Sequence, residues 1–524
     1  MILRLCIFLI LWSSYLLLYF TRKPLGIIKV NLEKDYDYSK FQIGLLDSAF
    51  LLPYSLGQIF FVNTIKQHNP MRFLLVTLIL AGLSTLSLGL VVGNFGAFFI
   101  LLALNGSFQA FFWPLAIQLI SNIFTHSSHL NLILGIYGTC AFSGGTIGTL
   151  FAVYIRDKYD WRLIYPITSL IMICCAIVFM IIYEYLKTRL ISHNIFQGSD
   201  AGNIKTTNGV PKAINALRNI YQNPMMSISN IYQALINKIH EALAIFKTVP
   251  MVFDVSLFML CLKTIRYILY MWLPLLLEQK SQYNSTKAGN ISAIFEIGGL
   301  LGSIILGYLL DRYFKRCQMK GVYYFLVCNL ICIFVFLYCT SDPGINWITT
   351  ASILLFLGLF LGGLDNMMGS CVPLFIINDY HSHHPAKKLS NEGKDLSEIV
   401  KKLSNEGKDL SEIVDESEVV VDKSTVIGLV NGVGSLGTFI EGPFIGFLLV
   451  SNGMSSSAFT RKDLSSANMD IDNWFRFYVL IFLLALIPVI RSLVSPTCRK
   501  RIFAKPSLQS LDSKGVENLL ILNE

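Results

Sequence analysis

The residues best suited to chemistry in this chain are basic side chains within long apolar segments. Arg22, Lys23 and Lys29 follow the apolar opening "MILRLCIFLILWSSYLLLYF", and Lys263 and Arg266 lie near the centre of "MVFDVSLFMLCLKTIRYILYMWLPLLL". A Lys or Arg in the middle of a membrane helix costs about 2.5–3.5 kcal/mol on insertion scales, so it usually faces a cavity or a partner. These cations therefore predict an anion-binding site inside a membrane.

The types and spacing of the cations indicate which of them would bind the anion. A guanidinium presents a planar fork of donors that fits phosphate or carboxylate with two bonds, whereas lysine supplies a point charge. Lys263 and Arg266 are three residues apart and share one helical face. Arg22 and Lys29 are seven apart and share a face, whereas Lys23 points about 100° away. Arg22 is the stronger candidate and Lys29 the weaker, and Lys23 also fits the flank of a membrane helix.

Four acids also lie inside apolar segments: Asp47, Glu296, Asp365 and Glu441. Each is able to counter the cations, to carry a proton or to pair with a neighbouring helix. Glu296 is the preferred candidate for a direct role in the site. The chain has no histidine well inside an apolar segment, which argues against a histidine proton relay.

The stretch "NGSFQAFFWP" at 105–114 adds polar and aromatic candidates. Asn105 and Gln109 are four residues apart on one helical face and are predicted polar contacts of the site, and Trp113 precedes Pro114 at a predicted kink. The small residues of "GIYGTCAFSGGTIG" (135–148) and "GLVNGVGSLGTFIEGPFIG" (428–446) predict close packing between helices.

The composition places these segments in a polytopic membrane protein. The 524 residues are 54% hydrophobic and 14% charged, whereas soluble chains are about a quarter charged. Soluble domains and nucleic-acid binding are therefore excluded. The eleven cysteines have no CxxC pair and no zinc spacing, and no catalytic nucleophile or phosphate-binding glycine loop is recognisable. We expect neither an enzyme nor a cofactor or metal.

Apolar runs predict an all-α fold of 12 transmembrane helices in two six-helix bundles. The N-terminal bundle is expected at 1–187, a basic cytoplasmic linker at 188–249, the C-terminal bundle at 250–495 and a tail at 496–524. The spans are predicted at about 3–30, 42–64, 72–93, 95–122, 130–155, 163–187, 250–278, 287–310, 321–340, 347–377, 425–450 and 473–495.

Charge in the loops predicts the orientation of the chain. The linker, the loop "DRYFKRCQMK" and the tail are basic, which places them and both termini in the cytoplasm. The sequons at Asn284 and Asn290 fall on the opposite side. An insertion at 379–424 contains the tandem "KKLSNEGKDLSEIV" and is expected to be a disordered or loosely helical cytoplasmic loop. We expect a monomer in the lipid bilayer, with the particular membrane left open.

These motifs resemble the major facilitator superfamily and, within it, the organophosphate:phosphate antiporters and sugar-phosphate exchangers. "YFTRKPLGIIKVNL" is similar to their first-helix RK motif, and "GSFQAFFWP" to their fourth-helix G-x-x-Q-x-x-x-WP. "LKTIRYILYMWLP" resembles their seventh helix, and "EIGGLLGSIILGYLLDRYFKR" resembles helix eight running into the superfamily D-R loop. The resemblance covers nearly all of both halves.

The resemblance implies roles for particular residues. Arg22 and Arg266 match the two phosphate-binding arginines, Lys263 matches a lysine of the eukaryotic exchangers, and Glu296 matches the helix-eight acid. Asp311 and Arg312 match the gating D-R motif. Two features depart from the family pattern: the D-R loop of the first half is degraded to "NTIKQHNPMR" (63–72), and residues 140–142 replace a histidine of many relatives.

The expected function is a carrier that exchanges a phosphorylated small metabolite for inorganic phosphate by alternating access. The alternative on the same fold is a carrier of another organic anion, such as a carboxylate, with or without proton coupling, because arginines bind both groups. A membrane receptor or scaffold without transport would leave Arg22, Lys263 and Arg266 without a reason to bear their insertion cost.

Overall fold

The structure is a computed structural model that describes most of the chain. The predicted tandem insertion from 384 to 420, the linker from 193 to 223 and most of the degraded loop, 63–68, lie outside the described residues. The described ranges are 2–62, 69–125, 127–192, 224–280, 283–315, 317–340, 346–383, 421–450 and 467–503.

Every regular element is helical in the part of the chain that the structure describes. The elements of the first half are α1 (Ile2–Arg22), α2 (Pro24–Tyr36), α3 (Lys40–Leu56), the π-helix η1 (Gly57–Phe61), α4 (Pro70–Val91), α5 (Phe95–Gln109), α6 (Phe112–Ile123), α7 (Leu130–Lys158), the short 3₁₀ helix η3 (Trp161–Leu163) and α8 (Ile164–Ser192).

The second half is also helical, and α10 precedes its first long helix. Its elements are α10 (Pro224–Thr248), α11 (Val252–Lys280), α12 (Ser285–Tyr313), α13 (Gln318–Thr340), α14 (Trp347–Gly369), α15 (Cys371–His383), α18 (Lys423–Val450), α19 (Ala467–Val494) and α20 (Pro496–Phe503).

Each of the twelve predicted spans falls on one or two of these helices. In the described residues, nine helical segments are long and apolar enough to cross a membrane, and eleven if each of two sharply bent pairs counts as one span. Many large apolar side chains on their outer surfaces are exposed, including Leu90 at 81% and Ile181 at 64%. Such surfaces suit contact with lipid rather than water.

Three of the predicted spans are divided: the first at Lys23, the fourth at residues 110–111 and the tenth at Ser370, between α14 and α15. The first span divides at Lys23, because Pro24 has no N–H to continue the helix and instead begins α2. The predicted kink at Trp113 is confirmed as a break between α5 and α6, at residues 110–111. Residues Arg4–Tyr36 nevertheless form one candidate membrane span across the division at Lys23.

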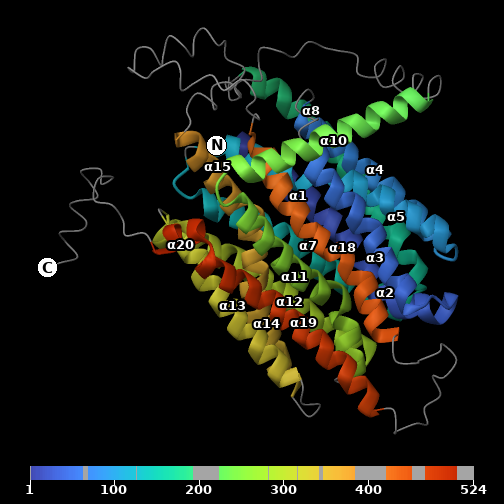
Figure 1. The fold of residues 1–524 in the computed structure, drawn as a ribbon. Helices are drawn as coiled ribbons and strands as arrows, with labels where there is room; N and C mark the ends of the chain where they lie inside the picture. The colour runs from blue at the N-terminus through green and yellow to red at the C-terminus, as the bar shows by residue number, and fades with distance from the viewer. Residues whose placement is uncertain are drawn as a thin grey trace, which may run out of the picture.

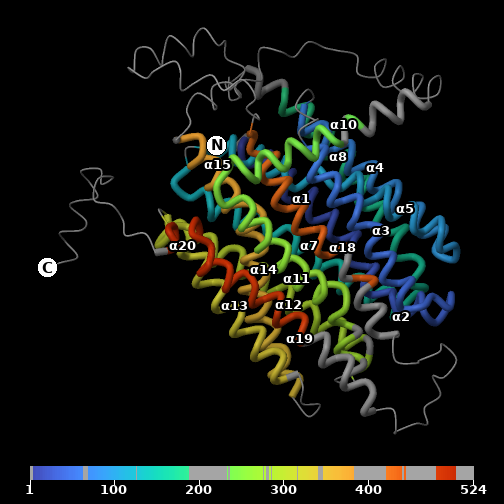
Figure 2. The backbone as a smooth tube through the Cα atoms, viewed as in Figure 1, coloured from blue at the N-terminus to red at the C-terminus, as the bar shows by residue number. Residues whose placement is uncertain are grey.

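The long helices run side by side, and α10 crosses their ends (Figure 1). Residues 236–248 of α10 are bent by 108° from residues 252–274 of α11. Figure 2 shows the N terminus, α10 and α15 at one end of the assembly and α2 towards the other. We call these ends the α10 side and the α2 side.

Two helix pairs join the halves: α7 with α12, and α3 with α18. Glycines allow their backbones to touch, as the sequence predicts. A Cβ added at Gly44 of α3 would lie 2.1 Å from the Gly442 carbonyl oxygen of α18, and one at Gly135 of α7 would lie 2.4 Å from the Ser303 oxygen of α12. Since real Cβ atoms do not come so close, larger residues at these positions would separate the two halves.

Candidate functional site

Among the described residues, five Lys and Arg side chains are buried inside the helical bundle. Their exposed fractions are 7% or less, although each carries a group that prefers water. Lys23 is 1% exposed, so its reading as the solvated flank of a helix is wrong. The five are Arg22, Lys23, Lys29, Lys263 and Arg266.

Arg22 ends α1 and is held by a neutral amide from α5. Its Nε donates a hydrogen bond to Oε1 of Gln109, and Nε2 of Gln109 donates to Oδ1 of Asn105 at 2.6 Å. This confirms that Asn105 and Gln109 share one face and act as polar contacts in the interior. Nη1 and Nη2 of Arg22 are buried and have no hydrogen-bond partner.

Arg266 of α11 is held by a carboxylate from α14. Its Nη1 donates to Oδ2 of Asp365, and its guanidinium carbon lies 4.3 Å from the centre of the Phe142 ring. Nε and Nη2 of Arg266 are buried without a hydrogen-bond partner. Asp365 is absent from the sequence-predicted site because nothing in the local pattern of α14 pairs it with a residue 99 positions earlier.

The two arginines therefore share one geometric feature. In each guanidinium, one nitrogen is bound by a neighbouring side chain and the two that remain form one complete edge of the fork. Such an edge donates two parallel hydrogen bonds to a phosphate or a carboxylate. The guanidinium carbons of Arg22 and Arg266 lie 4.8 and 5.8 Å from the centre of the Tyr19 ring, which places both edges around one aromatic side chain.

Lys263 lies one helical turn from Arg266 and also faces the interior. Its Nζ donates to Oδ1 of Asn431 at 2.7 Å, and Nδ2 of Asn431 donates to Oε1 of Gln58 at 3.0 Å. These bonds link α11, α18 and η1, so they cross between the halves. Asn431 is not among the site residues predicted from the sequence, although it is a polar residue inside the glycine-rich run 428–446.

A cavity lies between the two halves beside these residues. Lys263, Arg266 and Trp113 of the predicted site line it, together with Asp365 and the unpredicted Asn431. The full lining is Tyr15, Tyr19, Trp113, Gly138, Ala141, Phe142, Met259, Lys263, Arg266, Asp365, Asn366, Gly369 and Asn431.

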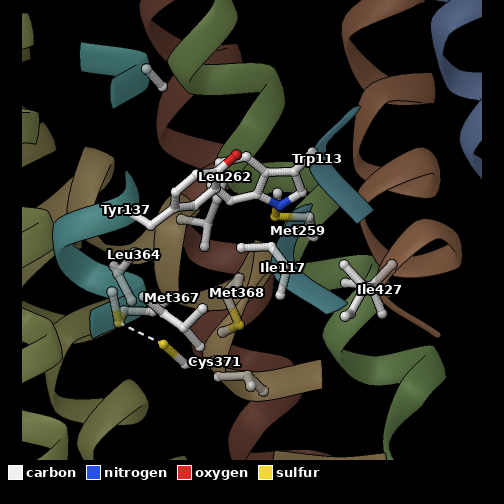
Figure 3. Packing of buried hydrophobic residues seen from close by; sticks show 14 of the residues in the cluster. Trp113, Ile117, Tyr137, Met259, Leu262, Leu364, Met367, Met368, Cys371 and Ile427 are labelled. Atoms are coloured by element: carbon white, nitrogen blue, oxygen red, sulfur yellow. Dashed lines mark hydrogen bonds between the residues drawn. The ribbon is translucent and has the colours of Figure 1, made fainter. Parts of the chain in front are cut away.

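Buried apolar side chains pack beside the cavity. Figure 3 shows Trp113 and Tyr137 together with Met259 and Leu262 of α11. The indole Nε1 of Trp113 donates to the Gly369 carbonyl oxygen at 2.8 Å, which fixes the ring across the interface between the halves. In such surroundings the charges of the site act with little screening.

The two remaining cations have acidic partners of their own. Nζ of Lys23 lies 3.5 Å from Oε1 of Glu296 and donates to the Tyr270 carbonyl oxygen at 2.8 Å. Nζ of Lys29 lies 2.6 Å from Oδ2 of Asp47. Glu296 thus neutralises Lys23.

Lys29 is placed apart from the cavity. Besides its bond to Asp47 of α3, its Nζ lies 3.8 Å from the centre of the Trp272 ring, which comes from the other half. Like Arg22, Gln109 and Glu296, it is not among the residues that line the cavity. Arg22 is bound by the neutral Gln109 of α5, whereas Lys29, about two helical turns further along, is bound by the carboxylate of Asp47.

The charges of the site do not cancel. Of the five buried cations, Lys23, Lys29 and Arg266 form ion pairs with Glu296, Asp47 and Asp365. In the described ranges, Arg22 and Lys263 form no ion pair with an acid. Among the side chains that the structure describes, five cations and three acids give the interior a formal charge of +2, which suits an anion with two charges. The side chain of Glu441, the fourth acid of the apolar segments, lies outside the described residues.

The predicted gating residues lie at the α10 side. Oδ2 of Asp311, near the end of α12, accepts a hydrogen bond of 2.7 Å from the backbone N–H of Leu132 in the first turn of α7. Arg312 is exposed. At the α2 side of the same helix pair, Oγ1 of Thr286 donates to Oδ2 of Asp157 at 2.8 Å. The α7–α12 interface is thus joined at both ends.

The sequence matches the family model described as Major Facilitator Superfamily over residues 11–385. The chain belongs to the major facilitator superfamily. As a member of that superfamily, the protein is a multi-pass membrane transporter and not an enzyme. The predicted fold class is confirmed.

Known relatives within the superfamily include exchangers of phosphorylated sugars. The zebrafish (Danio rerio) glucose-6-phosphate exchanger SLC37A2 is 25% identical over 405 residues, which cover 68% of this chain and 74% of that protein. The mouse (Mus musculus) glucose-6-phosphate exchanger SLC37A1 is 24% identical over 449 residues, covering 80% and 76%. The bovine (Bos taurus) sugar phosphate exchanger 3 is 23% identical over 401 residues, covering 70% and 78%.

A solved structure of the same superfamily has a similar fold. The proton:xylose symporter XylE, bound to 6-bromo-6-deoxy-D-glucose, superposes with a TM-score of 0.58 over 93% of this chain and 95% of that one. The sequences are 11% identical. The likeness therefore supports the major facilitator fold and carries no argument about substrate.

Proposed function

We propose that this transporter exchanges a phosphorylated small metabolite, such as a sugar phosphate or glycerol phosphate, for inorganic phosphate. The observation that carries the proposal is the pair of free guanidinium edges of Arg22 and Arg266 in a closed interior. A buried donor without a partner costs about 1–3 kcal/mol, and more when it is charged. A phosphoryl group has enough oxygen acceptors to satisfy both edges.

The proposal assigns a role to each residue around the cavity. Arg22 and Arg266, one from each half, hold the phosphoryl group, and Lys263 adds a point charge. Gln109 orients Arg22, and Trp113 forms part of the cavity wall. Glu296 limits the excess positive charge through Lys23. Lys29 has no direct part, because its ammonium group is bound to Asp47 outside the cavity.

The charge of the site gives a physical reason for exchange rather than one-way transport. An empty site would enclose a net charge of +2 in an apolar interior, which opposes closure of the two halves. A bound dianion removes that cost, so the halves move past each other only when the site is loaded. Each outward passage of one anion is then followed by the return of another.

The gating residues fit alternating access. Opening towards the α10 side must break the bond between Asp311 and the first turn of α7, and opening towards the α2 side must break the bond between Thr286 and Asp157. In the proposal the α10 side, both termini and Arg312 face the cytoplasm, which agrees with the basic loops there. The carrier works as a monomer and requires no cofactor.

A second candidate is a carrier of carboxylates on the same fold. One observation favours it: Arg266 already binds a carboxylate, that of Asp365. Guanidinium groups do not by themselves distinguish carboxylate from phosphate. The net charge of +2 weighs against a monocarboxylate, which would leave one charge uncompensated.

Exchange in liposomes tests the proposal. The purified protein is reconstituted into liposomes loaded with phosphate, and uptake of radiolabelled phosphate is measured with and without external glucose-6-phosphate, glycerol-3-phosphate, phosphoenolpyruvate or a carboxylate. We expect uptake that requires internal phosphate and is displaced by an organic phosphate. Folded protein that exchanges no phosphate, or that responds only to the carboxylate, would overturn the proposal.

A further inference from the structure

In all three buried ion pairs of the site one carboxylate oxygen has no hydrogen-bond partner, and the pair of Arg266 and Asp365 is the one of these three that contains an arginine. An arginine and a carboxylate can form two parallel hydrogen bonds. Here only Nη1 and Oδ2 are joined, and Nε and Nη2 of Arg266 and Oδ1 of Asp365 are all buried without hydrogen-bond partners. The pair is therefore only half formed, in an interior where a full pair would be favoured.

The position of Asp365 also differs from that of the other interior acids. Asp365 lines the cavity together with Lys263 and Arg266, whereas Glu296 and Asp47 do not. Its carboxylate is 5% exposed at the residue level and faces the space that an anion would enter. An entering phosphoryl group would be repelled by this charge, and both would bind the same guanidinium.

The neighbours of Asp365 leave it without a second partner. From α11 it faces Arg266 and Lys263, but Lys263 donates to Asn431 of α18 instead. Asn366, beside it in the chain, donates weakly to the Leu134 carbonyl oxygen at 3.5 Å. The carboxylate is therefore attached to the site by its one bond to Arg266.

We propose that Asp365 competes with the transported anion for Arg266, so that its charge weakens binding of the anion and speeds its release. This inference rests on the proposed function and adds a residue that sets affinity and turnover. In the empty site Asp365 holds the guanidinium in place. When the anion binds the free edge, the repulsion between the two anions keeps the complex from becoming too stable to turn over.

Arg22, the corresponding arginine of the first half, has no competing acid at its side chain. Arg22 is held through Nε by Gln109, which is neutral and has the same length as glutamate. Two opposite substitutions are therefore possible. Asp365→Asn removes the competing charge from Arg266, and Gln109→Glu introduces a competing charge at Arg22. Asparagine retains an oxygen that can accept the bond from Nη1.

Phosphate exchange in liposomes tests the inference through half-saturation and maximal rate measured separately. For Asp365→Asn we expect the phosphate concentration at half-saturation to fall about tenfold, because a unit charge of the same sign has been removed nearby. The maximal rate should fall as well, since release becomes slower. Asp365→Glu should remain within about threefold of wild type in both quantities.

The reciprocal variants separate charge from shape. Gln109→Glu should raise half-saturation about tenfold, and Gln109→Glu combined with Asp365→Asn should return it to within about threefold of wild type. Glu184→Gln, which removes an acid from a partly exposed pair with Arg72, is the matched control and should change neither quantity. The thermal unfolding midpoint of each variant checks its fold.

Several outcomes would overturn the inference. Half-saturation that is unchanged or higher in Asp365→Asn would show that the carboxylate does not compete with phosphate. If that variant does not fold, unchanged half-saturation in Gln109→Glu would exclude the same electrostatic account. Loss of all phosphate exchange in the wild-type protein would instead refute the proposed function, so the two failures are distinguishable.

Discussion

Arg22 and Arg266 occupy corresponding helices of the two halves but are held by different groups. Gln109 holds Arg22 without changing its charge, and Asp365 holds Arg266 while neutralising it. Both side chains present two free donors to the interior. Arg22 therefore keeps its full charge for an anion, whereas Arg266 offers a fork whose charge is already balanced by Asp365.

The largest effect is expected from Arg22→Lys. Lysine keeps the positive charge but cannot bind Gln109 and an anion at once through a planar fork. We expect the ratio of maximal rate to half-saturation for phosphate exchange to fall about 100-fold, measured in proteoliposomes. Arg72→Lys, at an arginine whose side chain is 50% exposed and pairs with Glu184, is the matched control and should retain wild-type exchange.

A smaller effect is expected from Arg266→Lys. The new lysine can still pair with Asp365. The guanidinium that is lost is the one whose charge Asp365 already balances. The same ratio should fall about tenfold. A loss equal to that of Arg22→Lys would remove the distinction between the two arginines, and near wild-type exchange would exclude two-bond binding at Arg266.

The smallest effect on phosphate binding is expected from Lys29→Met, which separates a paired cation from the anion site. Half-saturation should stay within about twofold of wild type, while the variant loses about 3–5 kcal/mol of stability because Asp47 is left buried and unpaired. Lys29→Met combined with Asp47→Leu should recover most of the stability in a thermal unfolding assay. A large change in half-saturation with an intact fold would place Lys29 in the anion path.

The sequence predicts the helices better than it predicts their partners. Each apolar run coincides with one or two helices, and the Trp113–Pro114 pair marks the break between α5 and α6, because these features depend on a few neighbouring residues. The burial of Arg266 and Lys263 also follows from their central place in one apolar run.

Long-range pairings could not be predicted in the same way. Asp365 is 99 residues from Arg266, and Asn431 is 168 residues from Lys263. Helical periodicity gives the face of a residue but not the helix that faces it. For Lys29, periodicity gives a face shared with Arg22 but not the carboxylate of Asp47 that binds it.

The helix α10 is a further feature that the composition of the linker does not indicate. Residues 188–249 read as a basic connection, yet α10 crosses the ends of the long helices (Figure 1). Ile245 and Val249 are buried at 0% and 1% exposure, which attaches the end of the linker to the helices. Apolar residues recur at helical spacing through this segment, at Leu235, Ile239, Ala242, Ile245 and Val249, and this pattern is the signal that could have predicted the helix.

The central claim is that Arg22 and Arg266 bind one anion together, and a double-mutant cycle tests it most directly. The ratio of maximal rate to half-saturation for phosphate exchange is measured for wild type, Arg22→Lys, Arg266→Lys and the double variant. The account predicts that the double variant loses less than the product of the single losses, by about tenfold, because either change already disrupts the shared site. Fully multiplicative losses would show that the two arginines act independently and would contradict it.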